Sequence, residues 1–68
     1  MSMDILLNGK AQSVNDAATV ADLLKELGVS TRGIAVEVNG ELVSRIAHPT
    51  HRLTSGDRLE IVTLVGGG

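Results

Sequence analysis

The stretch TVADLLKELG, residues 19–28, decides the fold class. Its apolar side chains recur at the i, i+3, i+4 and i+7 spacing of one helix face, at Val20, Leu23, Leu24 and Leu27. Thr19 can cap the helix with its hydroxyl, Asp22 stands at the third helical position, and Gly28 follows as a C-terminal cap. A helix of about nine residues is too short to persist alone in water. We therefore expect it to be held by packing on a sheet.

Two Asn-Gly pairs predict tight hairpins before and after this helix, because both residue types adopt the positive φ angles that such turns need. Asn8-Gly9 joins a strand over residues 3–7 to a return over residues 12–15. Asn39-Gly40 joins a strand over residues 34–38 to residues 41–43. Alternation predicts the inward-facing side chains of these strands to be Ile5, Leu7, Val14, Ile34, Val36 and Val38.

The last strand completes the fold. Residues 44–54 form an irregular stretch from which Leu53 fills the core, and residues 59–64 alternate as a strand after a turn. This strand has no hairpin partner in sequence, so we expect it between the first and third strands. The order predicts an α+β domain of the β-grasp (ubiquitin-like) type, a mixed sheet of four to five strands covered on one face by one main helix. We expect this domain over residues 1–65 and a flexible glycine tail over 66–68.

Composition limits the classes of function. The chain has 68 residues, enough for one small domain, with no Cys, Phe, Trp or Tyr. It therefore offers no thiolate metal site, no thiol nucleophile and no aromatic platform for stacking bases or flat cofactors. The six basic residues are scattered singly and the net charge is −2, so we expect no nucleic-acid partner. No apolar run has the length of a membrane span and no signal peptide is visible, so we expect a cytoplasmic protein without a membrane partner.

No group of side chains predicts a catalytic or metal site. Asp57 and Glu60 are close in sequence, but one falls in a turn and the other on the outer face of the last strand, as solvated charges do. His48 and His51 have the spacing of a helical zinc pair, but Pro49 lies between them and no third ligand is evident. We expect an ordinary loop there, no catalytic residue, no metal and no cofactor bound by this chain.

The sequence ends in Leu64-Val65-Gly66-Gly67-Gly68, which is the remaining candidate. Three glycines add nothing to a core and chain ends often fray, so this pattern alone fits an inert terminus as well as a functional tail. A functional tail would thread into a partner's site, where Gly66 and Gly67 present no Cβ, and would deliver the carboxylate of Gly68. Fully extended, the four residues after Leu64 span about 13–14 Å.

Covalent chemistry at this carboxylate needs activation. A carboxylate is a poor electrophile, but an acyl-adenylate contains a good leaving group. A sulfur nucleophile would then give a thiocarboxylate. Because the chain has no Cys, sulfur has no side chain to reside on, and the C-terminus is the place left for it.

The outer face of the sheet offers a surface for docking. If the last strand is central, Leu6, Val62 and Leu64 project away from the helix into solvent. A contiguous aliphatic patch beside the tail is typical of a docking surface. The alternative is that Leu64 bends inward or that the three side chains are merely scattered.

Nearly the whole chain resembles the ThiS family, the sulfur carriers of thiazole formation in thiamine biosynthesis. The matching segments are ILLNG (5–9), TVADLL (19–24), AVEVNGELV (35–43), SGDRLEIV (55–62) and VGGG (65–68). The turn in the third segment, the Gly56-Asp57 pair and the terminal glycines together carry the resemblance. Ser44 departs from it, since the family often has Pro before the Arg of this loop.

The resemblance implies partners as well as a reaction. An E1-like adenylyltransferase of the ThiF type uses ATP to adenylate the last glycine, which becomes a thiocarboxylate and passes its sulfur to a thiazole synthase of the ThiG type. By this correspondence Gly68 carries the sulfur, Gly67 completes the diglycine, and the chain is a carrier, not an enzyme. The alternatives are a β-grasp carrier like the small subunit of molybdopterin synthase, a ubiquitin-like modifier joined to lysines, and an interaction domain with an inert tail.

Overall fold

Helix α1 (Val20–Leu27) forms where the apolar spacing predicts it, and it is eight residues long. The capping box is complete, because the Thr19 hydroxyl oxygen accepts the Asp22 N–H at 3.2 Å and the Asp22 carboxylate accepts the Thr19 N–H at 3.0 Å. Gly28 ends the helix with a left-handed φ of 71°, and its N–H donates to carbonyls of the last turn. Local sequence therefore sets both ends of this helix.

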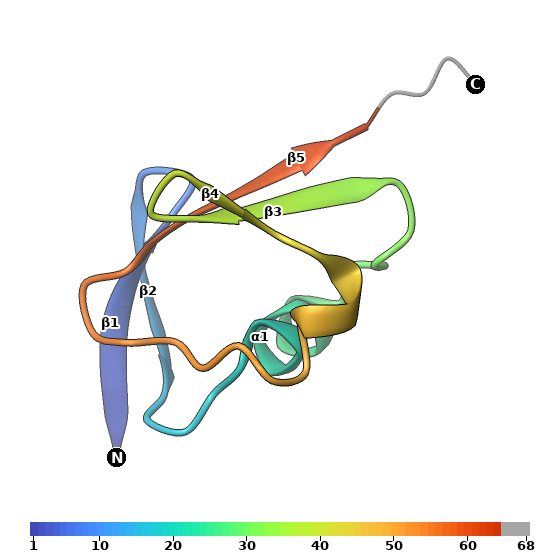
Figure 1. Cartoon of the computed structure of the whole chain (residues 1–68). Helices are drawn as coiled ribbons and strands as arrows, with labels where there is room; N and C mark the ends of the chain where they lie inside the picture. Colours follow the sequence, from blue (N-terminus) through green and yellow to red (C-terminus); the bar gives the residue numbers. More distant parts are fainter. Residues whose placement is uncertain (65–68) are drawn as a thin grey trace.

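A computed structural model describes residues 1–64 of the chain. Its strands are β1 (Ser2–Leu7), β2 (Lys10–Asn15), β3 (Ile34–Val38), β4 (Glu41–Val43) and β5 (Arg58–Thr63). They form one sheet in the order β2-β1-β5-β3-β4, in which β5 pairs in parallel with β1 and antiparallel with β3. Figure 1 shows α1 beneath this curved sheet, on one face only. The predicted insertion of the last strand and the predicted α+β layering are confirmed.

Both predicted hairpins are confirmed, and their turns correct one strand boundary. Asn8 and Gly9 have φ angles of 49° and 84°, and Asn39 and Gly40 have 53° and 85°. A two-residue turn pairs its flanking residues directly, so Leu7 faces Lys10 and β2 begins at residue 10 instead of 12. Strands β1 and β5 likewise start one residue before the predicted bounds, and β5 ends at Thr63.

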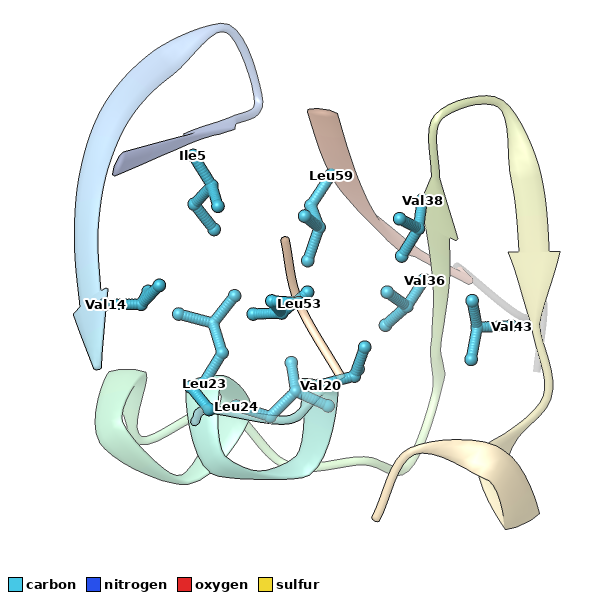
Figure 2. Close-up of a cluster of buried hydrophobic side chains, with 11 residues drawn as sticks. Ile5, Val14, Val20, Leu23, Leu24, Val36, Val38, Val43, Leu53 and Leu59 are labelled. Carbon is cyan, nitrogen blue, oxygen red and sulfur yellow. The ribbon is translucent and has the colours of Figure 1, made fainter. Parts of the chain in front are cut away.

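The core is aliphatic and lies between the sheet and α1. Figure 2 shows side chains from β1, β2, β3, β4 and β5 pointing toward those of the helix. The residues with the least exposure are Ile5, Val20, Leu23, Leu24, Val36 and Leu59. Leu53 enters from the loop before β5 and is buried, as predicted. Burying a Val, Leu or Ile side chain contributes about 1.5–3 kcal/mol, so this cluster supplies the main stabilising term of the domain.

The stretch 44–54 is more ordered than its sequence predicts. Residues Arg45–Ala47 form a short 3₁₀ helix, η1, and the loop that follows packs against the start of α1. The carbonyls of His48 and His51 accept the N–H groups of Ala21 and Val20, both at 3.0 Å. These N–H groups belong to the first turn of α1, which has no intrahelical acceptor for them. The loop therefore completes the N-terminal cap that Thr19 begins.

Candidate functional site

Strand β5 is the part of the described structure that leads into the glycine tail. The backbone N–H and C=O groups of successive β5 residues point alternately toward β3 and toward β1. Those of the even-numbered residues point toward β3. At one end of this series the Arg58 carbonyl accepts the backbone N–H of Asn39 at 2.7 Å. At the other end the Leu64 N–H donates to the Gly33 carbonyl, also at 2.7 Å. The odd-numbered residues face the side of β1, where Leu59 accepts from the N–H of Asn8 at 2.9 Å. With its side chain 1% exposed, Leu59 anchors the strand in the core.

The two Asn-Gly turns hold β5 from opposite sides. The Asn8 side-chain oxygen accepts the N–H of Ile61 at 2.9 Å, and the Asn39 side-chain oxygen accepts the N–H of Arg58 at 2.9 Å. Asn39 also donates to the carboxylate of Asp57 at 3.0 Å. Sequence reasoning explained both asparagines by turn geometry alone and missed this second role. The signal was the choice of Asn in both turns, because Gly or Asp also suit such turns and Gly has no side-chain oxygen to offer.

The three predicted docking residues are all exposed on the outer face of the sheet, at 40% for Leu6, 46% for Val62 and 55% for Leu64. Their contiguity needs a correction, however, because Leu6 lies opposite Arg58 in the register of β1 and β5. Val62 is four residues farther along β5, which is about 13 Å at the usual rise of a strand. Glu60 occupies the outer face between them. Leu6 is therefore separate from the tail.

A smaller apolar surface does lie at the end of β5, and we call it the tail-side patch: Ala35, Val62 and Leu64. Ala35 is directly opposite Val62 in the pairing of β3 with β5. Leu64 follows Val62 by two positions, which places it on the same face. Leu64 does not bend inward. The docking role of Val62 and Leu64 remains a prediction, and the register adds Ala35 to it.

An acidic pair borders the tail-side patch. Glu37 and Glu60 are directly opposite each other on β3 and β5, two residues away from Ala35 and Val62 on their strands. Like charges at such a position repel and weaken the pairing of the two strands. Two further exposed apolar side chains, Leu42 on β4 and Ile46 on η1, were not predicted as surface features. Leu42 is opposite Glu37, so it shares the outer face with the acidic pair.

The loop histidines are structural in this fold. His48 is buried at 4% exposure, and its Nε2–H donates to the carbonyl oxygen of Val43 at 3.2 Å. Its Nδ1 finds no hydrogen-bond partner among residues 1–64. The same residues contain no group of three or more His, Cys, Asp and Glu side chains that could hold a metal ion. Burial of His48 shows that this loop packs into the fold, which the expectation of an ordinary loop did not include.

Two further predictions concern membrane crossing and the glycine tail. In the described part of the chain, no helix has the length and apolar character that a membrane crossing requires. Gly66, Gly67 and Gly68 lie outside the described residues, as does the predicted domain boundary at residue 65. Their roles in threading and in covalent modification therefore remain predictions.

Known proteins resemble this chain over nearly its whole length. The model of the ThiS family matches residues 5–68. The solved structure of the thiamine biosynthesis protein ThiS from Geobacter metallireducens has a TM-score of 0.84 and 33% identity, covering 97% of this chain and 100% of that one. The sulfur carrier protein ThiS of Thermus thermophilus is 34% identical over 64 residues, which is 94% of this chain and 98% of that protein.

A longer relative contains a similar stretch. The thiazole synthase of Paramagnetospirillum magneticum is 41% identical over 66 residues, which is 97% of this chain but 20% of that protein. The chain therefore spans about a fifth of the length of this relative. A segment similar to this chain thus occurs inside a polypeptide of a different name and much greater length.

Proposed function

Because the chain belongs to the ThiS family, we propose that it is a sulfur carrier of thiamine biosynthesis whose reacting group is the carboxylate of Gly68. One observation carries this proposal. The family match runs through residue 68 and includes the glycines, on a β-grasp body whose central strand β5 ends three residues before the first of them. A plain interaction domain gives no reason for the match to extend into the tail.

The proposed chemistry proceeds in two steps. On an adenylyltransferase of the ThiF type, the Gly68 carboxylate attacks the α-phosphorus of ATP, pyrophosphate leaves, and an acyl-adenylate forms. A hydrosulfide equivalent from a sulfur donor then attacks the carbonyl carbon and displaces AMP, which leaves a thiocarboxylate and releases a proton. ATP is consumed on the partner enzyme and the chain itself binds no cofactor. In this scheme the chain is a co-substrate and not a catalyst.

The residues of this chain position the reacting group. Leu59 anchors β5 in the core, and the strand leads along the outer face through Val62 and Leu64 toward the tail. Gly66 and Gly67 present no Cβ to the walls of a narrow channel. Ordering such a tail costs about 1–2 kcal/mol per residue, so docking must supply compensating contacts. The tail-side patch is the apolar surface nearest to these residues along β5 and is suited to provide them.

A thiazole synthase of the ThiG type is the acceptor that we propose for the sulfur. The similarity to a segment of the Paramagnetospirillum thiazole synthase supports it, since a carrier-like segment and that named activity share one polypeptide there. The thiocarboxylate sulfur at Gly68 would act as the nucleophile toward the thiazole precursor held by that enzyme. The acceptor distinguishes this proposal from a carrier of the molybdopterin synthase type, which shares the same tail chemistry.

Intact-mass spectrometry tests the proposal. The full chain is incubated with ATP, an adenylyltransferase of the ThiF type and a sulfur source, and the expected mass gain equals one oxygen replaced by sulfur. A chain synthesised with a C-terminal amide is the matched control, because it keeps every residue but offers no carboxylate. Absence of the gain with an enzyme that is active on its own carrier would contradict the proposal. Adducts to lysines of other proteins would instead identify a modifier.

A further inference from the structure

Within residues 1–64, the second half of β5 has a neighbouring strand on one side only. Strand β1 pairs with β5 at Arg58 and Leu59 and ends at Leu7, whereas β3 accompanies β5 as far as Thr63. In Figure 1 β5 continues past the tips of β1 and β2 with β3 beside it. Among residues 1–64, no strand lies against Ile61–Thr63 on the side that β1 vacates. Strand β5 is therefore a central strand of the sheet at its start and an edge strand of the described structure at its end.

The alternation of backbone groups shows what this edge presents. Since Leu59 and Ile61 face the β1 side, so does Thr63. The N–H of Ile61 is taken by the Asn8 side chain, so the groups on this side that no strand of residues 1–64 pairs with are the carbonyl of Ile61 and the N–H and carbonyl of Thr63. This series of acceptor, donor and acceptor is the pattern that an added strand pairs with.

The residues at this edge lack the protection that edge strands usually have. Proteins blunt exposed edges with charged residues, proline or bulges. The outer strands β2 and β4 carry Lys10 and Glu41. The open segment reads Ile61-Val62-Thr63-Leu64, which has no charge and no proline and in which three of four side chains are β-branched. Such a sequence favours pairing with a further strand.

We propose that this edge is a strand-addition site, at which an extended segment of the adenylyltransferase pairs with Ile61–Thr63 and so aligns the tail. The choice of this occupant rests on the proposed function. It follows from continuity, because the open edge belongs to the last described strand before the glycines, on which the adenylyltransferase acts in that proposal. Main-chain pairing holds a strand in a defined register, which a contact with the tail-side patch alone does not provide.

Replacing Thr63 by proline tests the proposal with little change to the fold. Thr63→Pro removes an N–H that faces the open side, so no bond to β3 is lost, and proline is tolerated at strand edges. Thr63→Val is the matched control, since it keeps both the N–H and the β-branched shape. We expect Thr63→Pro to raise the KM for the carrier in ATP-pyrophosphate exchange by about tenfold, the effect of one lost hydrogen bond and a blocked approach. Thr63→Val is expected to behave as wild type.

A second variant removes the same N–H donor without introducing a proline, so it does not depend on whether Thr63→Pro folds. A chain made by chemical synthesis with an ester in place of the amide between residues 62 and 63 keeps the side chain and loses the donor, and the Val62 carbonyl on the β3 side becomes a weaker acceptor. If the wild type is adenylated and both variants match its KM, strand addition is wrong and the sulfur-carrier function stands. If the wild type itself is not adenylated by an active enzyme, the carrier function fails, and the proposal fails with it.

Amide hydrogen exchange identifies the occupant. In the free chain the Thr63 amide is expected to exchange faster than the amide of Val62, which faces β3. Added adenylyltransferase is expected to protect Thr63. Protection that instead rises with the concentration of the carrier alone would mean that a second copy occupies the edge, which overturns the assignment to the enzyme.

Discussion

The two halves of β5 differ in what surrounds them. At Arg58 and Leu59 the strand pairs with β1, and Leu59 also pairs with β3 and is almost wholly buried. At Ile61–Thr63 it pairs with β3 alone among residues 1–64, and the side chain of Val62 is nearly half exposed. One continuous strand therefore serves the core at its start and the surface at its end. We infer that its first half mainly stabilises the domain and its second half mainly meets partners.

Leu59→Ala is the substitution with the largest expected effect on stability. Truncating a buried Leu costs about 2–5 kcal/mol, out of a total of roughly 3–10 kcal/mol for a domain of this size. Urea unfolding followed by circular dichroism measures the loss. A change below 1 kcal/mol would contradict the division of β5, because it would mean that the first half does not anchor the strand.

Asn8→Gly tests the boundary between the two halves. Glycine keeps the positive φ of 49° without strain but removes the oxygen that accepts from Ile61. We expect a loss of about 0.5–1.5 kcal/mol, the net value of one hydrogen bond, and faster exchange of the Ile61 amide. Asn39→Gly is the matched variant at the opposite turn, and in it the Ile61 amide should exchange as slowly as in the wild type. Equal exchange of Ile61 in both variants would show that Asn8 does not hold the strand.

Glu60→Gln probes the acidic pair that lies between Leu6 and the tail-side patch. Removing one of two like charges directly opposite each other should raise the free energy of unfolding by about 0.2–1 kcal/mol. The gain should shrink at high salt, since screening weakens repulsion between exposed charges. Thermal unfolding at two salt concentrations measures both effects. A loss of stability would indicate that Glu60 has a favourable partner.

Val62→Thr has the smallest expected effect on stability. The side chain is exposed and threonine keeps the β-branched shape, so the change should stay within about 0.5 kcal/mol. Affinity for the adenylyltransferase, measured by calorimetry, should nevertheless fall because the tail-side patch loses apolar surface. Leu6→Thr is the matched control on the same face, separated from the tail. If both variants weaken binding equally, the tail-side patch is not a distinct surface.

Local signals in the sequence predicted most of the fold. The Asn8-Gly9 and Asn39-Gly40 turns and the Thr19–Asp22 capping box depend on neighbouring residues, and all three are present in the structure. Alternation then assigned the faces of the strands correctly. The burial of Leu53 was predicted as well, although Ile46 of the same loop is exposed.

Long-range geometry could not be predicted in the same way. The register of a parallel pair such as β1 and β5 is not set by any turn, so the separation of Leu6 from Val62 became visible only in the structure. The same holds for the burial of His48, which depends on how the loop after β4 docks on α1. For the candidate site, sequence supplied the glycine tail and the exposed residues, and the structure supplied the open edge of β5.

Deletion of Gly68 tests the central claim most directly, when stability and sulfur uptake are measured on the same preparation. We expect an unchanged melting temperature, because a glycine has no side chain to add to the core, together with complete loss of the thiocarboxylate mass gain. A fall of several degrees would show that the tail is structural. Sulfur uptake by the shortened chain would show that Gly68 is not the carrier residue.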